Sequence, residues 1–190
     1  MIKVLEKYKK RIDIPLFAII FFITLLGLVT LSGSNLDTSN IIVNQVINIF
    51  VGLIIFTILI FTNPRILFSY APVLFLITIF LLILVHFFGV ESNGAKRWLA
   101  FGVFNLQPSE LMKITLPLII AWLYQQSQNK ITLSLHFTAI FLICIPFYLV
   151  LLQPDLGTSI MIAFSGFLII FLAGISWRLI LSSMIVAILS

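Results

Sequence analysis

Charged residues are scarce in this sequence. Only 9% of its 190 residues are Asp, Glu, Lys or Arg, whereas soluble domains carry about 25%. So little charge excludes a water-soluble domain, because the chain lacks the polar surface that would face water. Disorder is excluded as well, because 62% of the residues are hydrophobic and disordered chains are poor in such residues. Most of the solvent around this protein must therefore be lipid.

Cysteine and the residues of common catalytic motifs are also nearly absent. The single cysteine, Cys144, can form no disulfide within the chain, so cysteine usage does not indicate a compartment. His86 and His136 have no partners at the spacing of metal ligands, and we expect them to pack between helices. The sequence contains no metal motif, phosphate-binding loop or nucleophile–base pair. It predicts no metal site and no cofactor.

Long apolar runs are abundant. A bilayer core of about 30 Å takes about 20 helical residues to cross. A seventh run opens at Leu179, and its 12 residues to Ser190 are too few for a crossing. We therefore expect an all-α polytopic membrane protein, one transmembrane domain over residues 1–190, that is truncated within its seventh helix. The six complete spans are predicted at Pro15–Leu31, Ile41–Phe61, Ile66–Phe88, Pro108–Tyr124, Leu133–Leu152 and Gly157–Ala173.

The basic residues predict the orientation. Alternate counting from a cytoplasmic N-terminus places eight Lys and Arg residues inside and two outside, as the positive-inside rule requires. The net charge of +5 is thus a signal of topology, and we expect no nucleic-acid partner. A signal peptide is the alternative for the first span, but that span exceeds a signal core and no cleavage site follows it. The inside set is Lys3, Lys7, Lys9, Lys10, Arg11, Arg65, Lys130 and Arg178.

The same short motif stands at two helix starts on the predicted outer face. One copy is QPSELMK, residues 107–113, and the other is QPDLGT, residues 153–158. Proline suits the first position of a helix, and an acid in the first turn meets free N–H groups. For Glu110 and Asp155 this ordinary helix-start chemistry is the alternative to a functional role.

Lys113 is harder to explain by helix-start chemistry. It follows Glu110 by three residues and so shares its helix face. A cation near a helix N-terminus opposes the dipole, and lysine inside a membrane is costly. Pairing with Glu110 would offset part of this cost, and a lysine that reaches back to the interface is the alternative. We predict that Glu110 and Lys113 line a functional cavity, with Asp155 nearby.

A cationic cluster precedes the first motif. Lys96 and Arg97 stand beside Trp98, a combination suited to a phosphate or pyrophosphate. An interfacial anchor is an equal alternative, because Trp and Arg also gather at membrane boundaries.

Three segments together carry a resemblance: GAKRWL (94–99), QPSELMK (107–113) and QPDLGT (153–158) resemble motifs of the SEDS family, named for shape, elongation, division and sporulation. QPDLGTS followed by FLAGISWR is most similar to the rod-shape branch rather than the division branch. The resemblance implies a fold of about ten spans, of which this chain would hold the first half. The motif residues besides the acids and the lysine are Gln107, Pro108, Ser109, Gln153, Pro154, Gly157 and Thr158.

The resemblance also implies an activity. Family members are peptidoglycan glycosyltransferases that polymerise lipid II, release undecaprenyl pyrophosphate and work with a class B penicillin-binding protein. The motif glutamate and lysine that matter for activity fall on Glu110 and Lys113, and the second acid falls on Asp155. The family's leading candidate for the catalytic base lies in an outer loop beyond the seventh span, so we expect no activity from these 190 residues alone. Whether a divalent cation accompanies the pyrophosphate stays open.

Two other functions fit the same residues. A flippase for the lipid-linked precursor would use the buried acid and lysine as a polar path. An inactive membrane scaffold is the other alternative, favoured by the expected truncation. In each case we expect a multi-pass protein of the bacterial inner membrane, in contact with its lipids.

Overall fold

A computed structural model describes residues 13–33, 38–92, 94–102, 105–127 and 132–174. Its elements are mainly helices, with three short strands, and they divide into two units that are described in turn. The basic N-terminal segment up to Arg11 and the predicted seventh run from Leu179 lie outside the described residues.

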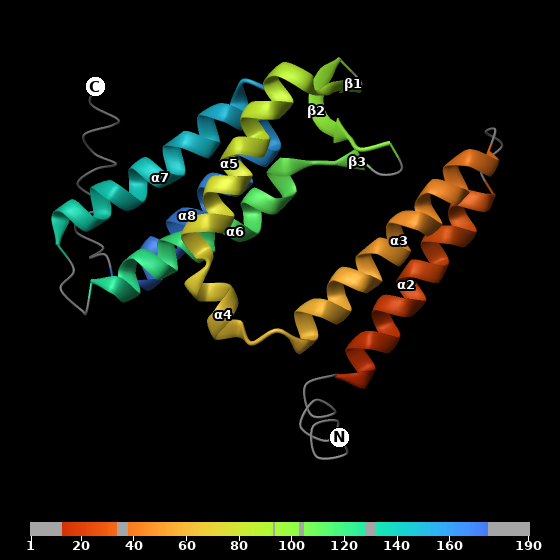
Figure 1. Ribbon diagram of the computed structural model, residues 1–190, viewed down its shortest axis with the longest axis horizontal. Coiled ribbons are helices and arrows are strands. Elements are labelled where there is room, and N and C mark those ends of the chain that lie inside the picture. Colours follow the sequence, from red (N-terminus) through yellow and green to blue (C-terminus); the bar gives the residue numbers. More distant parts are fainter. Residues whose placement is uncertain (1–12, 34–37, 93, 103–104, 128–131, 175–190) are drawn as a thin grey trace. The chain divides into compact units, whose positions relative to one another are not determined.

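The first unit is a pair of helices, α2 (Ile14–Ser32) and α3 (Thr38–Phe61), which lie side by side (Figure 1). Helix α2 begins where the Asp13 side chain accepts a hydrogen bond from the Leu16 N–H at 3.2 Å. Phe17, early in α2, stacks on Phe56, late in α3, with ring centroids 6.3 Å apart, so the two helices are antiparallel. No side chain of α2 is buried, as befits a helix whose surroundings are apolar.

The third predicted span is divided. The structure has α4 (Pro64–Ser69) and α5 (Ala71–Phe88), with Tyr70 between them, where one helix over Ile66–Phe88 was expected. The cause is Pro72 in the first turn of α5, because a proline ring would clash with a preceding turn of continuous helix.

The segment between α5 and α6 is not the irregular loop that an all-α fold implies. It forms strands β1 (Val90–Ser92), β2 (Ala95–Ala100) and β3 (Asn105–Leu106), paired antiparallel in that order. Gly94 has a φ of 79° at the turn between β1 and β2, a conformation that glycine adopts at little cost. Ala95 and Leu99 are buried while Lys96 is exposed, so one side of β2 faces the helices.

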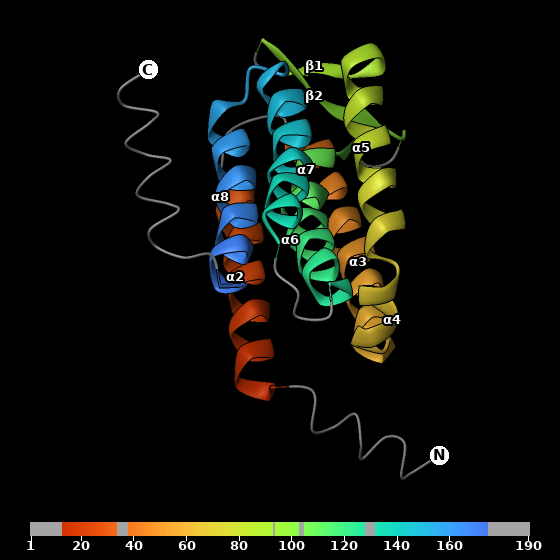
Figure 2. The same cartoon turned by 90° about the vertical axis from the view of Figure 1, so that its left-hand side faces the viewer.

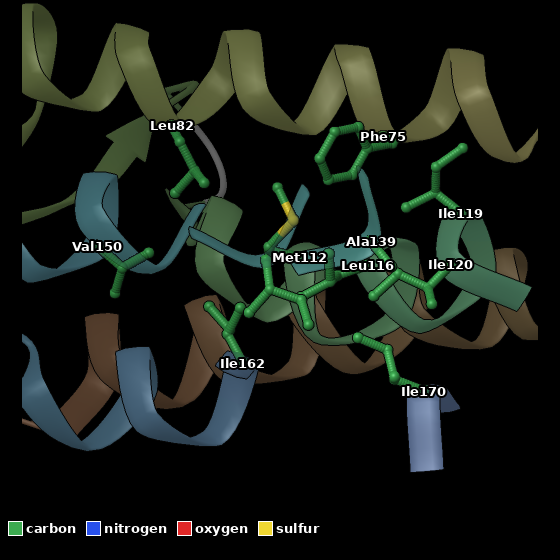
Figure 3. Packing of buried hydrophobic residues seen from close by; sticks show 11 residues of the cluster. Phe75, Leu82, Met112, Leu116, Ile119, Ile120, Ala139, Val150, Ile162 and Ile170 are labelled. Atoms are coloured by element: carbon green, nitrogen blue, oxygen red, sulfur yellow. The ribbon is translucent and has the colours of Figure 1, made fainter. Parts of the chain in front are cut away.

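The second unit contains α4, the strands and four longer helices: α5, α6 (Pro108–Gln126), α7 (Leu133–Leu151) and α8 (Leu156–Leu172). They run alongside one another, with the strands at one end (Figure 2). Their bounds match the predicted spans to within two residues, apart from the division at Tyr70. The buried cluster that joins them is drawn in Figure 3 and comprises Phe75, Leu82, Met112, Leu116, Ile119, Ile120, Ala139, Ile143, Val150, Ile162 and Ile170.

Helix α8 packs closely against its neighbours at one glycine. A Cβ on Gly166 would lie 2.7 Å from Cγ1 of Ile143 in α7 and 3.1 Å from Cδ1 of Ile120 in α6. Small residues at such contacts let helix backbones approach, which is how membrane helices gain packing energy.

Among the described residues, four helices are long and apolar enough to cross a membrane: α2, the Ile42–Phe61 part of α3, α5 and α7. Helix α8 is apolar but has 17 residues. Helix α6 begins with the polar Pro-Ser-Glu sequence and carries Lys113, which lowers its hydropathy. The protein is therefore mostly helical and multi-pass. The count of six spans, the cytoplasmic N-terminus and the single domain stay predictions.

Candidate functional site

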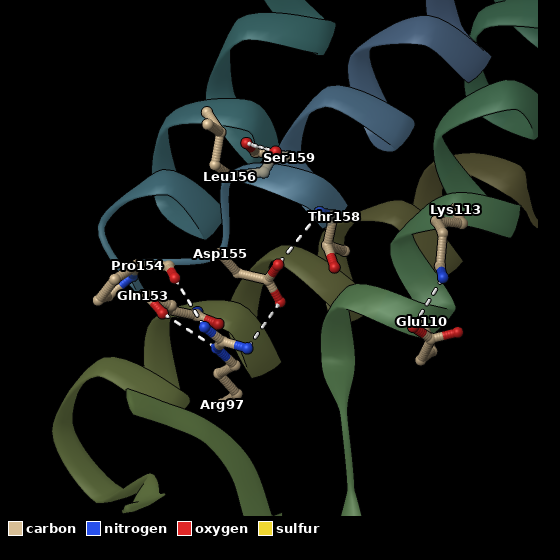
Figure 4. A network of polar contacts seen from close by, with 9 residues as sticks. All are labelled: Arg97, Glu110, Lys113, Gln153, Pro154, Asp155, Leu156, Thr158 and Ser159. Carbon is tan, nitrogen blue, oxygen red and sulfur yellow. Dashed lines mark hydrogen bonds and ion pairs between the residues drawn. The ribbon is translucent and has the colours of Figure 1, made fainter. Parts of the chain in front are cut away.

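Glu110 and Lys113 form an ion pair at the start of α6, as their spacing suggests, while the functional cavity stays a prediction. Lys113 Nζ lies 2.7 Å from Oε1 of Glu110, one turn apart on the same face of the helix (Figure 4). The Lys113 side chain is 33% exposed and that of Glu110 is 55% exposed, so both groups are accessible from outside this unit. The pair supplies an acceptor and a cation within reach of one ligand.

The start of α6 is held by its own sequence. Gln107 precedes the helix in an extended conformation, and Pro108 occupies the first turn, where its missing N–H leaves no donor unsatisfied. Pro108 and Ser109 are buried, so these two motif residues anchor the helix end while Glu110 points outward. Glu110 also lies where the positive end of the helix dipole favours an acid.

The second copy of the motif forms the turn from α7 to α8. Oδ1 of Asp155 accepts a hydrogen bond from the Thr158 N–H at 3.1 Å and so caps α8. The helix-start chemistry expected for this acid is thus present. Gly157, in the first turn, has open space where a Cβ would be, so packing in this unit does not require a glycine there.

Arg97 binds this turn instead of projecting into solvent. Its Nη2 donates to the Pro154 carbonyl at 2.7 Å and its Nε to the Gln153 carbonyl at 3.4 Å. Its Nη1 forms an ion pair with Oδ2 of Asp155 at 3.7 Å, and the Asp155 side chain is only 13% exposed (Figure 4). We refer to Arg97 and Asp155, with the two carbonyls, as the outer clamp, after the membrane face predicted for this end of the bundle.

Gln153 extends the connection to a third helix. Its buried side chain donates from Nε2 to the Leu82 carbonyl of α5 at 3.3 Å. The turn that follows α7 is therefore bound both to β2 and to α5.

The cationic cluster predicted from the sequence is divided by the structure. Lys96 is exposed, and in the described part of the chain its side chain has no hydrogen bond or ion pair; Glu91 lies opposite it in the β1–β2 register. Arg97 points to the α7–α8 turn, and Trp98 is partly buried in β2 opposite Val90. Lys96 alone of the three presents a free charge.

The site thus comprises two groups at one end of the bundle. The outer clamp lies where α8 begins, and the Glu110–Lys113 pair lies where α6 begins. No hydrogen bond or ion pair joins the two groups within the described segments. Nor do three His, Cys, Asp or Glu side chains gather there in a way that could hold a metal ion.

A partly buried polar contact between two helices was also not predicted from the sequence. At the other end of α6, Tyr124 Oη and His136 Nδ1 of α7 are 2.6 Å apart, and His136 is 7% exposed. The packing role expected for His136 agrees with this burial. Its partner 12 residues away offered no local signal, because the contact depends on how α6 and α7 pair.

Comparison with known proteins gives a consistent family. The family model of FtsW, RodA and SpoVE, described as a cell cycle protein, matches residues 11–190. The peptidoglycan glycosyltransferase MrdB of Escherichia coli is 44% identical over 129 residues, which are 68% of this chain and 35% of that protein. The probable peptidoglycan glycosyltransferase FtsW of Thiomicrospira cyclica is 43% identical over 110 residues, 55% of this chain and 27% of its own. This chain therefore spans about a third of the curated relatives it matches.

Solved structures agree with the sequence comparison. One is a chain of a peptidoglycan synthase complex that coordinates polymerization and crosslinking, with a TM-score of 0.78 and 31% identity over 93% of this chain and 52% of that one. The other is a mutant of the rod shape determining protein RodA of Thermus thermophilus, with a TM-score of 0.76 and 31% identity over 94% of this chain and 59% of that one.

Proposed function

Because the chain belongs to the FtsW/RodA/SpoVE family of cell cycle proteins, the SEDS family, and is most like its RodA members, we propose that it acts in peptidoglycan synthesis. The activity proposed is that of a glycosyltransferase that polymerises lipid II into glycan strands for wall elongation and rod shape. The observation that carries this proposal is the Glu110–Lys113 ion pair, accessible at the start of α6.

The chemistry needs what this end of the molecule supplies. A hydroxyl that attacks the sugar loses a proton, and the pyrophosphate that leaves gains negative charge. Lys113 and the free Lys96 are cations that can hold a pyrophosphate, and Glu110 orients Lys113 and accepts hydrogen bonds from sugar hydroxyls. We assign no general base among the described residues, because both oxygens of Asp155 are engaged.

The membrane arrangement is part of the proposal. We propose six complete spans and a cytoplasmic N-terminus, so that the strands and both motif copies face outward in the bacterial inner membrane. The positive-inside count supports this orientation. A class B penicillin-binding protein is the proposed partner, because a structural relative belongs to a complex that couples polymerization to crosslinking.

A polymerisation assay tests the proposal. The full-length protein, purified with its penicillin-binding partner, is incubated with lipid II in detergent, and the glycan products are resolved on a gel. A polymerase forms glycan strands in detergent, without a second compartment. A flippase only moves lipid II across the bilayer of proteoliposomes. Failure to form strands together with transbilayer movement of lipid II would contradict the proposal.

The same assay tests the pair. We expect Lys113→Ala to lower the formation of glycan strands by at least tenfold, because the cation that faces the pyrophosphate is lost. Gln126→Ala is the control, since Gln126 is an exposed residue at the far end of the same helix and takes no part in the pair. Unchanged strand formation by Lys113→Ala would remove the pair from the proposed site.

A further inference from the structure

We propose that Arg97 is a positioning residue: through the outer clamp it fixes the strands, and with them the start of α6, without touching the lipid-linked substrate. This inference rests on the proposed function only where substrate kinetics are used. It departs from the phosphate-binding role that the sequence alone suggests for the Lys96–Arg97 cluster.

All three nitrogens of Arg97 already face acceptors of the protein, although its side chain is 35% exposed. Each of its three nitrogens faces a different acceptor: the Gln153 carbonyl, the Pro154 carbonyl and the Asp155 carboxylate (Figure 4). The planar guanidinium suits such a set of fixed acceptors, which a lysine ammonium cannot reproduce. A phosphate that drew the guanidinium away from this turn would leave the 13% exposed carboxylate of Asp155 without its counter-charge.

The neighbouring cation has the opposite environment. Successive side chains of a strand point to opposite faces, so Lys96 faces outward while Arg97 reaches the α7–α8 turn. Lys96 is exposed and has no partner in the described residues, and its ammonium can meet a phosphate without breaking a contact. Of the two adjacent cations, one binds the fold and the other is free for a ligand.

The clamp also acts on the Glu110–Lys113 pair through the backbone. Strand β2 carries Arg97 and pairs with β3, with Leu99 opposite Leu106. Strand β3 ends at Leu106, two residues before α6 begins at Pro108. Loss of the Arg97 contacts would therefore loosen β2 and its pairing with β3. The start of α6, where the Glu110–Lys113 pair lies, would be loosened with them.

A double-mutant cycle tests the clamp without substrate. Arg97→Gln and Asp155→Asn are each expected to lower the melting temperature of the detergent-solubilised protein by about 2–4 °C; asparagine retains the helix cap, so the second change removes only the charge. The double variant should lose less than the sum of the two, because the partners are coupled. Lys96→Gln, on the same strand, should leave the melting temperature unchanged. Additive losses, or none, would overturn the clamp.

Substrate kinetics test the positioning role. We expect Arg97→Gln to lower kcat for lipid II polymerisation severalfold with KM changed less than twofold, and Arg97→Lys to restore little. A several-fold rise in KM that Arg97→Lys reverses would make Arg97 a substrate contact and overturn the proposal. The melting temperatures of the double-mutant cycle do not depend on activity. If the unsubstituted protein does not polymerise lipid II, that result counts against the proposed function, and the melting temperatures alone decide whether the clamp exists.

Discussion

At the scale of single residues, Lys113 contributes little to the stability of the fold. It lies near the N-terminus of α6, where the helix dipole disfavours a cation. Its ion pair with Glu110 is partly exposed, and exposed pairs contribute about 0–1 kcal/mol. This small contribution agrees with the ligand-binding role proposed for Lys113.

The small contribution of Lys113 to stability predicts what happens when its charge is removed. Lys113→Met keeps the length of the side chain and its helix propensity, so the melting temperature in detergent should fall by no more than about 2 °C or should rise. The same sample should no longer polymerise lipid II into glycan strands. A large fall in melting temperature would instead make Lys113 a structural residue.

The sequence allowed the pair to be predicted but not the clamp. Glu110 and Lys113 are three residues apart, and helix geometry alone brings them together. Arg97 and the Pro154 carbonyl are 57 residues apart. Their contact depends on how the helices pair, which no local pattern encodes, so the sequence predicted Arg97 only as a phosphate-binding cation or an interfacial anchor.

At the scale of elements, apolar runs defined most helix bounds because length and hydrophobicity suffice to predict a membrane helix. Pro72 signals the division of the third span, but the apolar residues around it predict one continuous helix. The strands were signalled by Asn93-Gly94, a hairpin sequence between short β-prone segments. Both signals are weaker than the hydropathy that surrounds them.

Close packing of α8 gives a prediction for one glycine. In Gly166→Ala the added Cβ would meet the buried side chains of Ile143 and Ile120, which are close-packed. Overpacking of this kind costs about 1–3 kcal/mol, so the melting temperature should fall by several degrees.

Two further variants make this test specific. Gly157→Ala, in the first turn of the same helix, adds a methyl group to open space and should leave the melting temperature unchanged or raise it. Ile143→Val, combined with Gly166→Ala, should recover part of the loss because it removes a methyl group at the contact. Equal effects of both glycine variants would show that packing at Gly166 is not the cause.

At the scale of the whole molecule, the orientation in the membrane was inferred from charge and not from the fold. The arrangement of the helices is the same whichever face is outside, whereas the positive-inside rule acts through the flanking residues. Orientation is therefore a separate prediction with its own test.

Cysteine labelling measures the orientation. In a Cys144→Ala background, Lys96→Cys on β2 should react with a membrane-impermeant maleimide added to intact spheroplasts. Gln126→Cys, exposed at the far end of α6, should react only after permeabilisation. The reverse pattern would place the strands and both motif copies in the cytoplasm.

The outer clamp also has a consequence for the order in which the protein assembles. Arg97 leaves the ribosome 57 residues before the Pro154 carbonyl that it binds. At synthesis rates of about 5–20 residues per second, that delay is roughly 3–11 s. During this interval α6 and α7 are synthesised while Arg97 still lacks its acceptors. Formation of the clamp therefore has to wait for the turn into α8, and the end of the bundle that carries the strands is completed late.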